Sequence, residues 1–170
     1  AEALEDYATA IEVSTDDWQT GRALHNRANI YWVQEKWDLC IEEYTQAIEI
    51  STSAVFTSSM VISYQNRARI YQIIKNYEKA LEDFQSAIDL DDEDPELHEY
   101  RADCYVEMED YTSALKDFDK AIELAPNDPY YYNNRADFYE EQEQYAEALE
   151  DYATAIEVST DDWQTGRALH

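Results

Sequence analysis

A six-residue cluster, Asn-Arg-Ala-x-x-Tyr, returns along the chain at regular intervals. It occupies residues 26–31, 66–71 and 134–139, and residues 100–105 carry a variant that begins with Tyr. The alanines of the four clusters are spaced 40, 34 and 34 residues apart. A recurrence with periods of this size is typical of repeat proteins, in which each repeat forms one small unit that stacks on its neighbours.

A second pattern follows each cluster at a constant distance. It consists of a small residue, an aromatic residue four positions later and an alanine three positions after that: Cys40, Tyr44, Ala47; Ala80, Phe84, Ala87; Ala114, Phe118, Ala121; Ala148, Tyr152, Ala155. These steps follow one face of a helix. Asp94-Pro95 and Asp128-Pro129 each place a capping carboxylate before a proline and mark helix starts. Each unit is therefore predicted to be two helices joined by a short turn.

Together these positions resemble the tetratricopeptide repeat family. The matching residues are Tyr64 or Tyr132, Ala68/Ala102/Ala136, Tyr71/Tyr105/Tyr139, Tyr77/Tyr111/Tyr145, Ala80/Ala114/Ala148, Phe84/Phe118/Tyr152, Ala87/Ala121/Ala155 and Pro126. The resemblance spans essentially the whole chain. It implies an all-α fold, a right-handed superhelical solenoid of antiparallel helix pairs, with the first helices lining a concave surface that usually binds peptides.

The resemblance also sets a register over a single array. Full units are expected at 21–54, 61–94, 95–128 and 129–162, with 1–17 as the second helix of a preceding unit and 163–170 as the start of a further one. Six extra residues lie within 51–60 and three within 14–20, the latter again within 159–165. We expect these insertions to lengthen the first helices that follow them or to bulge the turn.

Residues 1–25 return letter for letter as residues 146–170, at an offset of 145. We interpret the chain as one period, plus overlap, of a tandem array that forms a long superhelical fibre or filament, a non-enzymatic structural scaffold. The link between periods is either covalent or made by self-association. The alternative is an adaptor that binds a peptide segment of a partner protein on its concave face.

The charge limits the partners. With 39 acidic residues against 12 Lys and Arg, the formal net charge is −27, which disfavours nucleic acid. No apolar run approaches the roughly 18 residues of a membrane span. We therefore expect other copies of the chain, or a basic or amphipathic peptide, as partners, and no membrane insertion. Free thiols favour a reducing interior, whereas acidity and a polymeric habit favour an extracellular or cell-surface filament, and the compartment stays open.

Residues for catalysis, cofactor binding or a metal site are not expected. Only His25 and His98 are distinct histidines, because His170 copies His25, and no His-x-x-x-His, Cys-x-x-Cys or glycine-rich phosphate loop occurs. Cys40 and Cys104 are interpreted as packed thiols. An arginine recurs beside the core alanine of every unit, at Arg27, Arg67, Arg101 and Arg135, and is predicted to form a structural ion pair with a carboxylate of a neighbouring helix.

The candidate partner-binding residues come from projecting the first helices onto the expected concave face. They are Arg22, His25 and Asn29 in the first unit, Asn66 and Arg69 in the second, Tyr100 and Asp103 in the third, and Asn133 and Asp137 in the fourth. Asn29 and Asn66 match the family's carboxylate-binding clamp, but Glu96 and Tyr100 stand where its last two cations belong. A face that is basic early and acidic late suits a basic or amphipathic segment, and it also fits a simple solvated face.

Overall fold

The computed structural model describes residues 2–14, 16–50 and 57–167, and of residue 2 and residues 160–167 it describes only the backbone. Within these ranges it contains nine α-helices and no strand, which confirms the all-α class. The chain divides into two compact units, residues 1–92 with α1–α5 and residues 93–170 with α6–α9. The handedness of the superhelix depends on how these units are placed and stays a prediction.

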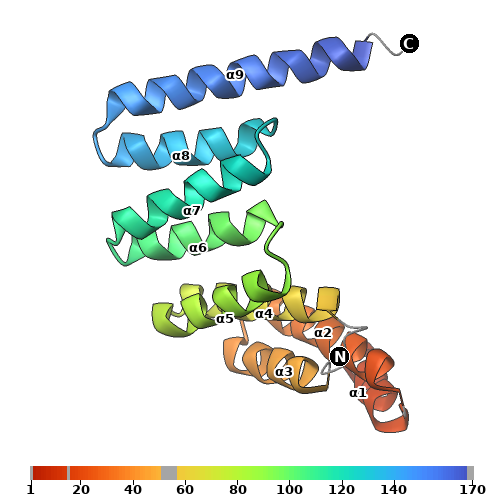
Figure 1. Ribbon diagram of the computed structural model, residues 1–170. Coiled ribbons are helices and arrows are strands. Elements are labelled where there is room, and N and C mark those ends of the chain that lie inside the picture. Colours follow the sequence, from red (N-terminus) through yellow and green to blue (C-terminus); the bar gives the residue numbers. More distant parts are fainter. Residues whose placement is uncertain (1, 15, 51–56, 168–170) are drawn as a thin grey trace. The chain divides into compact units, whose positions relative to one another are not determined.

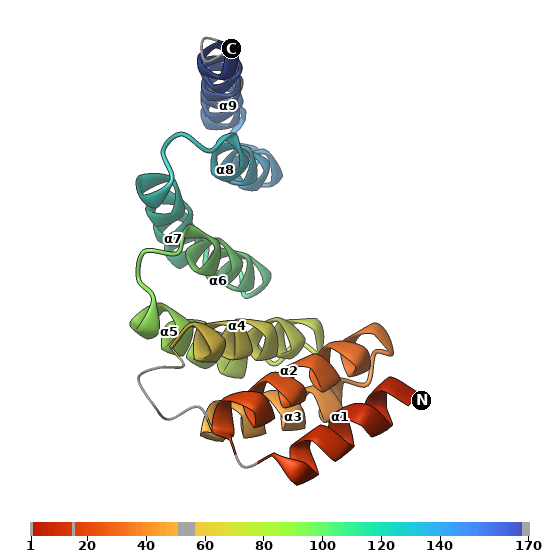
Figure 2. The same ribbon diagram turned by 90° about the vertical axis from the view of Figure 1, so that its right-hand side faces the viewer.

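The helices follow one another in the order expected for helix pairs. In the first unit they are α1 (Glu2–Val13), α2 (Asp17–Val33), α3 (Trp37–Ile50), α4 (Thr57–Ile73) and α5 (Tyr77–Leu90). In the second they are α6 (Pro95–Glu107), α7 (Tyr111–Leu124), α8 (Pro129–Glu141) and α9 (Tyr145–Arg167). Helix α2 packs on α3, α4 on α5, α6 on α7 and α8 on α9, while α1 packs on α2 (Figures 1 and 2).

Small residues allow the two helices of a pair to approach closely. In the first unit Ala28 of α2 and Cys40 of α3 are fully buried together with Tyr44 and Ile70. The Cys40 thiol donates to the Ala28 carbonyl at 3.4 Å, and burial raises the pKa of Cys40 to about 11. Cys104 is buried too, so both cysteines are packed thiols, as predicted. The second unit repeats this contact with Ala102, Ala114, Phe118 and Phe138.

The turn inside each pair closes on a residue in the left-handed conformation. Glu35, Lys75, Glu109 and Glu143 have φ between 55° and 61°. Around Lys75, the amide of Asn76 donates to the carbonyl of Tyr71 and the amide of Lys75 to that of Gln72, at 2.7 and 2.9 Å, the two bonds of a Schellman turn. The same two bonds recur at the other three turns. In each turn the longer-range bond is accepted by the carbonyl of the tyrosine that ends the repeated cluster.

Each repeated arginine forms an ion pair with a carboxylate sixteen residues later. Arg67, Arg101 and Arg135 each hold an aspartate through two hydrogen bonds of 2.7 Å, to Asp83, Asp117 and Asp151 respectively. Arg27 contacts Glu43 at 2.7 Å. The four carboxylates are buried, so each pair ties the first helix to the second where water is excluded. This confirms the structural reading of the arginines.

Burial alone raises the pKa of Asp117, but hydrogen bonds from Arg101 and His98 outweigh burial and lower it below its ordinary value. The opposite holds at Glu43, where burial outweighs Arg27 and raises the pKa. The glutamate makes one close contact with its arginine where the aspartates make two, and among the described residues the buried Nε of Arg27 has no hydrogen-bond partner. The first pair is therefore the least well matched of the four.

The insertions lengthen the helices that follow them. Helices α2 and α4 have 17 residues each, whereas α6 and α8, which follow the Asp-Pro turns, have 13. Asp94 and Asp128 cap α6 and α8 as predicted, with the side chain accepting from the amide two residues on. Residues 51–56, which hold most of the larger insertion, lie outside the described part of the chain.

The duplicated segment has two conformations. In the first copy α1 ends at Val13, Asp16 caps α2 through the amide of Trp18 at 3.0 Å, and α2 begins at Asp17. In the second copy the same letters continue as one helix from Tyr145 to Arg167, an unbroken ribbon in Figure 1. Residue 163, where a further unit is expected to start, lies within this helix, and that start stays a prediction. Residues 168–170 lie outside the described range, and the other unit boundaries stay a prediction.

Candidate functional site

Four predicted face residues lie around one buried tyrosine in the first compact unit. The hydroxyl of Tyr44 on α3 donates to Asn29 Oδ1 at 2.8 Å, and the side chain of Asn66 on α4 also hydrogen-bonds to it. The ring of His25 meets the Tyr44 ring edge-on, with centroids 5.4 Å apart. The charge of Arg69 acts on the same hydroxyl. Residues from α2 and α4 thus share one face, as the projection predicts.

The cations of this face lie on tryptophan rings. The guanidinium of Arg69 lies 5.4 Å from the centroid of Trp32, and that of Arg22 lies 5.2 Å from Trp18. At such distances the electron-rich face of the indole attracts the guanidinium. Burial lowers the pKa of His25, which favours the neutral imidazole at neutral pH. The positive charge here therefore comes from arginines and not from the histidine.

Asn29 and Asn66 match the carboxylate-binding clamp of the family, and both already form hydrogen bonds within the chain. Both amides that match the clamp hydrogen-bond to the Tyr44 hydroxyl, and Tyr44 is fully buried. The Tyr44 hydroxyl occupies the Oδ1 of Asn29, whereas a ligand carboxylate would accept from an amide nitrogen, so the two contacts use different atoms of this side chain. The expectation that this array does not capture a carboxylate tail rests on Glu96 and Tyr100 at the positions of the last two cations, and it stays a prediction.

The second compact unit contains an acidic recess between α6, α7 and α8, with a volume of about 160 Å³. Carboxylates from α6 and α8 line it together with an amide and three apolar side chains: Glu99, Asp103, Asp137, Glu141, Asn134, Val106, Phe118 and Phe138. Two of the predicted face residues, Asp103 and Asp137, therefore come together here. We call this site the acidic recess.

Hydrogen bonds orient two of its carboxylates. Glu99 is 4% exposed, and its Oε1 accepts from the Tyr130 hydroxyl at 3.2 Å and from Asn134 Nδ2 at 2.9 Å. Asp137 accepts from the Tyr152 hydroxyl on α9. Burial raises the pKa of Asp103 to about 6, and the charges of Glu107 and Glu141 add to that effect. A cation placed in the recess meets the buried Glu99 and the half-buried Asp103 together with two exposed carboxylates, Asp137 and Glu141.

The remaining predicted residues lie apart from the recess lining. Tyr100 donates to Glu96 at 3.1 Å on its own helix, and Asn133 is exposed while the next residue, Asn134, lines the recess. The prediction also missed Phe138 and Glu141. Asn134, Asp137, Phe138 and Glu141 are spaced i, i+3, i+4 and i+7, so extending the projection of α8 by one turn finds them.

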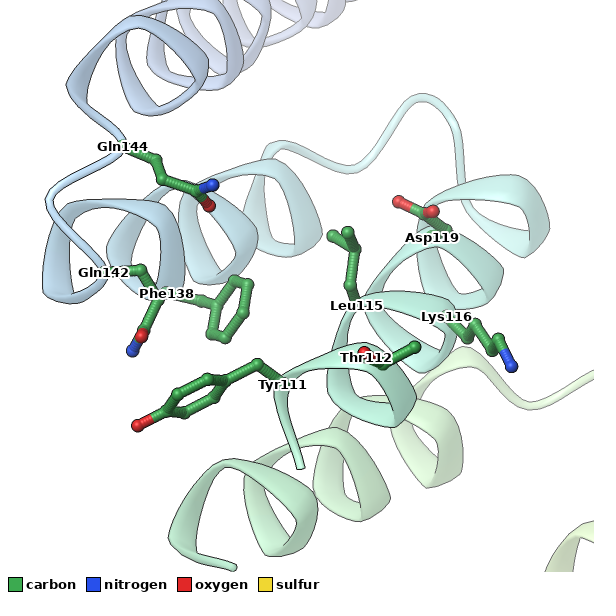
Figure 3. A pocket seen from close by; sticks show the side chains of 8 residues that line it. All are labelled: Tyr111, Thr112, Leu115, Lys116, Asp119, Phe138, Gln142 and Gln144. Atoms are coloured by element: carbon green, nitrogen blue, oxygen red, sulfur yellow. The ribbon is translucent and has the colours of Figure 1, made fainter. Parts of the chain in front are cut away.

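A larger recess, of about 540 Å³, lies between α7, α8 and the start of α9. Figure 3 shows Phe138, Tyr111 and Leu115 around its centre, with Gln142 and Gln144 on one side and Lys116 and Asp119 on the other. Asp119 is already paired with Arg135. None of the predicted face residues lines this recess. Its lining combines apolar and aromatic side chains with two neutral amides, a threonine, one lysine and one carboxylate that is already paired.

Groups of three or more His, Cys, Asp or Glu arranged to hold a metal ion are absent from the described residues. Among the same residues, no helix is both long enough and apolar enough to span a membrane. Burial raises the pKa of Cys104, like that of Cys40, to about 11, so both thiols are protonated at neutral pH.

Sequence models of the tetratricopeptide repeat match three stretches of the chain, residues 19–93, 95–128 and 118–150. No match to this chain is found among curated proteins. Proteins with this repeat bind partner proteins or peptides, and their fold is typically non-catalytic, so the chain is a protein-interaction scaffold in this general sense.

Solved structures of low sequence identity share the fold. MamA is 16% identical with a TM-score of 0.76, over 95% of this chain and 89% of that one. YrrB, described as a TPR protein with an unusual peptide-binding site, is 20% identical with a TM-score of 0.68, over 97% and 80%. BtubC from P. vanneervenii is 17% identical with a TM-score of 0.79, over 94% and 71%. These likenesses concern the fold alone.

The raised pKa of Asp103 predicts a pH-dependent stability. Because the folded-state pKa of about 6 lies above the unfolded value of about 3.9, folding is favoured by the protonated form and loses stability as pH rises from about 4 through about 6. Asp103→Asn should therefore stabilise the protein by roughly 1–3 kcal/mol at pH 7.5 and by almost nothing near pH 4.

The measurement is urea unfolding of both proteins at the two pH values. Glu123→Gln on α7 is the control, since it removes one exposed charge and should change stability by less than about 0.5 kcal/mol. A stabilisation by Asp103→Asn that is the same at both pH values would show that Asp103 does not titrate as described.

Proposed function

This chain belongs to the tetratricopeptide repeat family, and we propose that it is a non-catalytic structural scaffold, one period plus overlap of a tandem array that builds a filament. The observation that carries the proposal is that the two copies of one helix sequence bury opposite faces. Residues 2–13 and 147–158 have the same letters but different neighbours.

In the first copy the buried face is the one that meets the following helix. Helix α1 packs on α2, and Leu4, Ala8 and Ile11, spaced i, i+4 and i+7, are half-buried. In the same helix Ala3, Asp6 and Ala10 are exposed, although the corresponding alanines and aspartate are buried in the helix-pair contacts of α5, α7 and α9.

In the second copy the faces are reversed. Helix α9 packs on α8, which buries Ala148, Asp151 and Ala155, and Arg135 holds Asp151. On the far side of α9 the equivalents of the α1 contact are open, with Leu149 69% and Ile156 67% exposed.

A helix of this sequence therefore has two faces that each suit a neighbour, and each copy satisfies one of them. A tandem array satisfies both at every junction, because α8 precedes the helix and α2 follows it. The offset of 145 residues between the copies supports this, since it joins the end of one period to the start of the next without a gap or an overlap in the helix. The net charge of −27 keeps neighbouring filaments apart in solution.

The proposal predicts filaments in the native material. Cryo-electron microscopy should show continuous chains of helix pairs in which one axial period contains 145 residues, with four helix pairs to each period. A native protein that exists only as discrete particles without this period would contradict the filament.

The acidic recess supports a second function, that of an adaptor for a basic or amphipathic peptide. Its lining combines four carboxylates with the partly exposed Val106 over the buried Phe118 and Phe138, and so offers charge for a Lys or Arg side chain beside a small apolar contact. Pre-organised carboxylates attract a cation without a large rearrangement, because Glu99 is already oriented by Tyr130 and Asn134.

The adaptor reading predicts charge-dependent binding. An amphipathic peptide rich in Lys should bind at low salt, and Asp137→Lys should weaken it at least about tenfold by placing a like charge in the recess. Glu123→Lys changes the net charge equally but lies on exposed α7 surface outside the recess. Fluorescence anisotropy of both variants measures the difference, and equal weakening would leave only a general attraction between a basic peptide and an acidic protein.

A further inference from the structure

We propose that separate copies of this chain join head to tail by helix exchange, in which α9 of one copy takes the place of α1 on α2 of the next. The docking surface is the side of α2 that α1 covers, and its occupant is a second copy of the chain. The inference rests on the proposed array and names the contact through which free copies extend it.

The fit follows from the identity of the two segments. Leu149, Ala153 and Ile156 of α9 are exposed and correspond letter for letter to Leu4, Ala8 and Ile11 of α1, which are half-buried. The three side chains that α1 packs toward α2 are therefore present on the open side of α9 at the same helical positions, whereas the counterparts of Tyr7 and Ala10 remain engaged with α8. The surface of α2 that packs Leu4, Ala8 and Ile11 meets the same three residue types on α9.

Helix α1 is the more weakly held of the two. None of its side chains described in the structure is buried, whereas α9 buries Ala148, Asp151 and Ala155. A recess of about 260 Å³ opens along the contact of α1 with α2, where Tyr7 and Ala10 face Trp18 and Arg22. The contact that an incoming helix replaces is thus incomplete.

The incoming helix is also better prepared for docking. Helix α9 is already folded on α8 and fixed there by the two hydrogen bonds between Arg135 and Asp151. The 12 residues of α1 pack on α2, and none of their described side chains is buried there. Helix α1 loses conformational entropy when it docks on α2, whereas α9 is already ordered by α8 before it docks. Exchange therefore recovers the conformational entropy of α1, and this recovery partly offsets the translational and rotational entropy that two copies lose on association.

The exchange propagates without closing. The copy that receives α9 on its α2 still presents its own α9, so a third copy can bind in the same way. A contact between two different surfaces of this kind is heterologous and generates open chains. Assembly should therefore show a mass that grows with concentration and does not stop at a dimer.

The duplication supplies a matched pair of variants for the test. Leu149→Asp with Ile156→Asp puts two charges on the open face of α9, and Leu4→Asp with Ile11→Asp makes the same two changes in the same sequence on α1. Sedimentation velocity of the full chain across a wide concentration range gives the mass, and circular dichroism checks that each variant keeps its helices.

The two variants should behave oppositely. The α9 variant should remain at the monomer mass of 19.9 kDa at every concentration. The α1 variant should assemble at a concentration at least about tenfold lower than the unmodified chain, because α2 is released for α9 of another copy. If neither variant differs from the unmodified chain, or if both weaken assembly alike, helix exchange is wrong.

A photo-cross-linker locates the contact directly. Benzoylphenylalanine in place of Ala153 should cross-link to residues of α2 in a second chain, whereas in place of Ala8 it should cross-link to α2 within the same chain. The outcomes also separate this inference from the filament. If the native protein forms filaments with a 145-residue period but the free chain stays monomeric, the tandem array is supported and helix exchange is wrong. If the free chain assembles by exchange but the native protein forms no filaments, exchange is supported and the native array is wrong.

Discussion

The ion pair between each repeated arginine and a carboxylate sixteen residues later is the contact on which the rest of the structure depends. It joins the two helices of a pair at the point where their alanines touch, and it neutralises a carboxylate that the close approach removes from water. In an acidic chain with 12 Lys and Arg, four of the cations are used in this way. The remaining acidic residues are left for the surface, and in the second unit some of them form the acidic recess.

The same contact explains how one sequence adopts two environments. In α9 the aspartate of the duplicated helix is held by Arg135, and the helix turns its leucine and isoleucine outward. In α1 the equivalent Asp6 is exposed, and the leucine and isoleucine turn toward α2. The face that is buried therefore depends on which helix packs against this segment and not on its amino-acid sequence. A helix of this kind suits a position between two units, and this is the physical basis for both the array and the exchange between copies.

Much of the fold could be predicted from the sequence, because helix-pair contacts repeat at a fixed period. The alanine spacing, the Asp-Pro caps and the arginine pairs are all local patterns of residue type, and the structure confirms them. The left-handed turn residues could not be predicted in this way, since Glu35, Lys75, Glu109 and Glu143 replace the glycine that favours that conformation. The acidic recess was found only in part, because Phe138 and Glu141 continue the helix face of Asn134 and Asp137, at i+4 and i+7 from Asn134, and the projection did not include them. The two conformations of the duplicated segment could not be predicted, since identical sequences give no local signal that distinguishes the break between α1 and α2 from the continuous α9.

The most direct test of this account compares one substitution at two positions of identical sequence. Asp151→Asn and Asp6→Asn change the same letter in the same local context, and urea unfolding gives the free energy of each variant. Asp151→Asn is expected to cost about 3 kcal/mol, because it leaves a buried arginine poorly paired. Asp6→Asn, on an exposed face, is expected to change stability by less than about 0.5 kcal/mol. Equal effects at the two positions would contradict the claim that the arginine pair organises the helix pair.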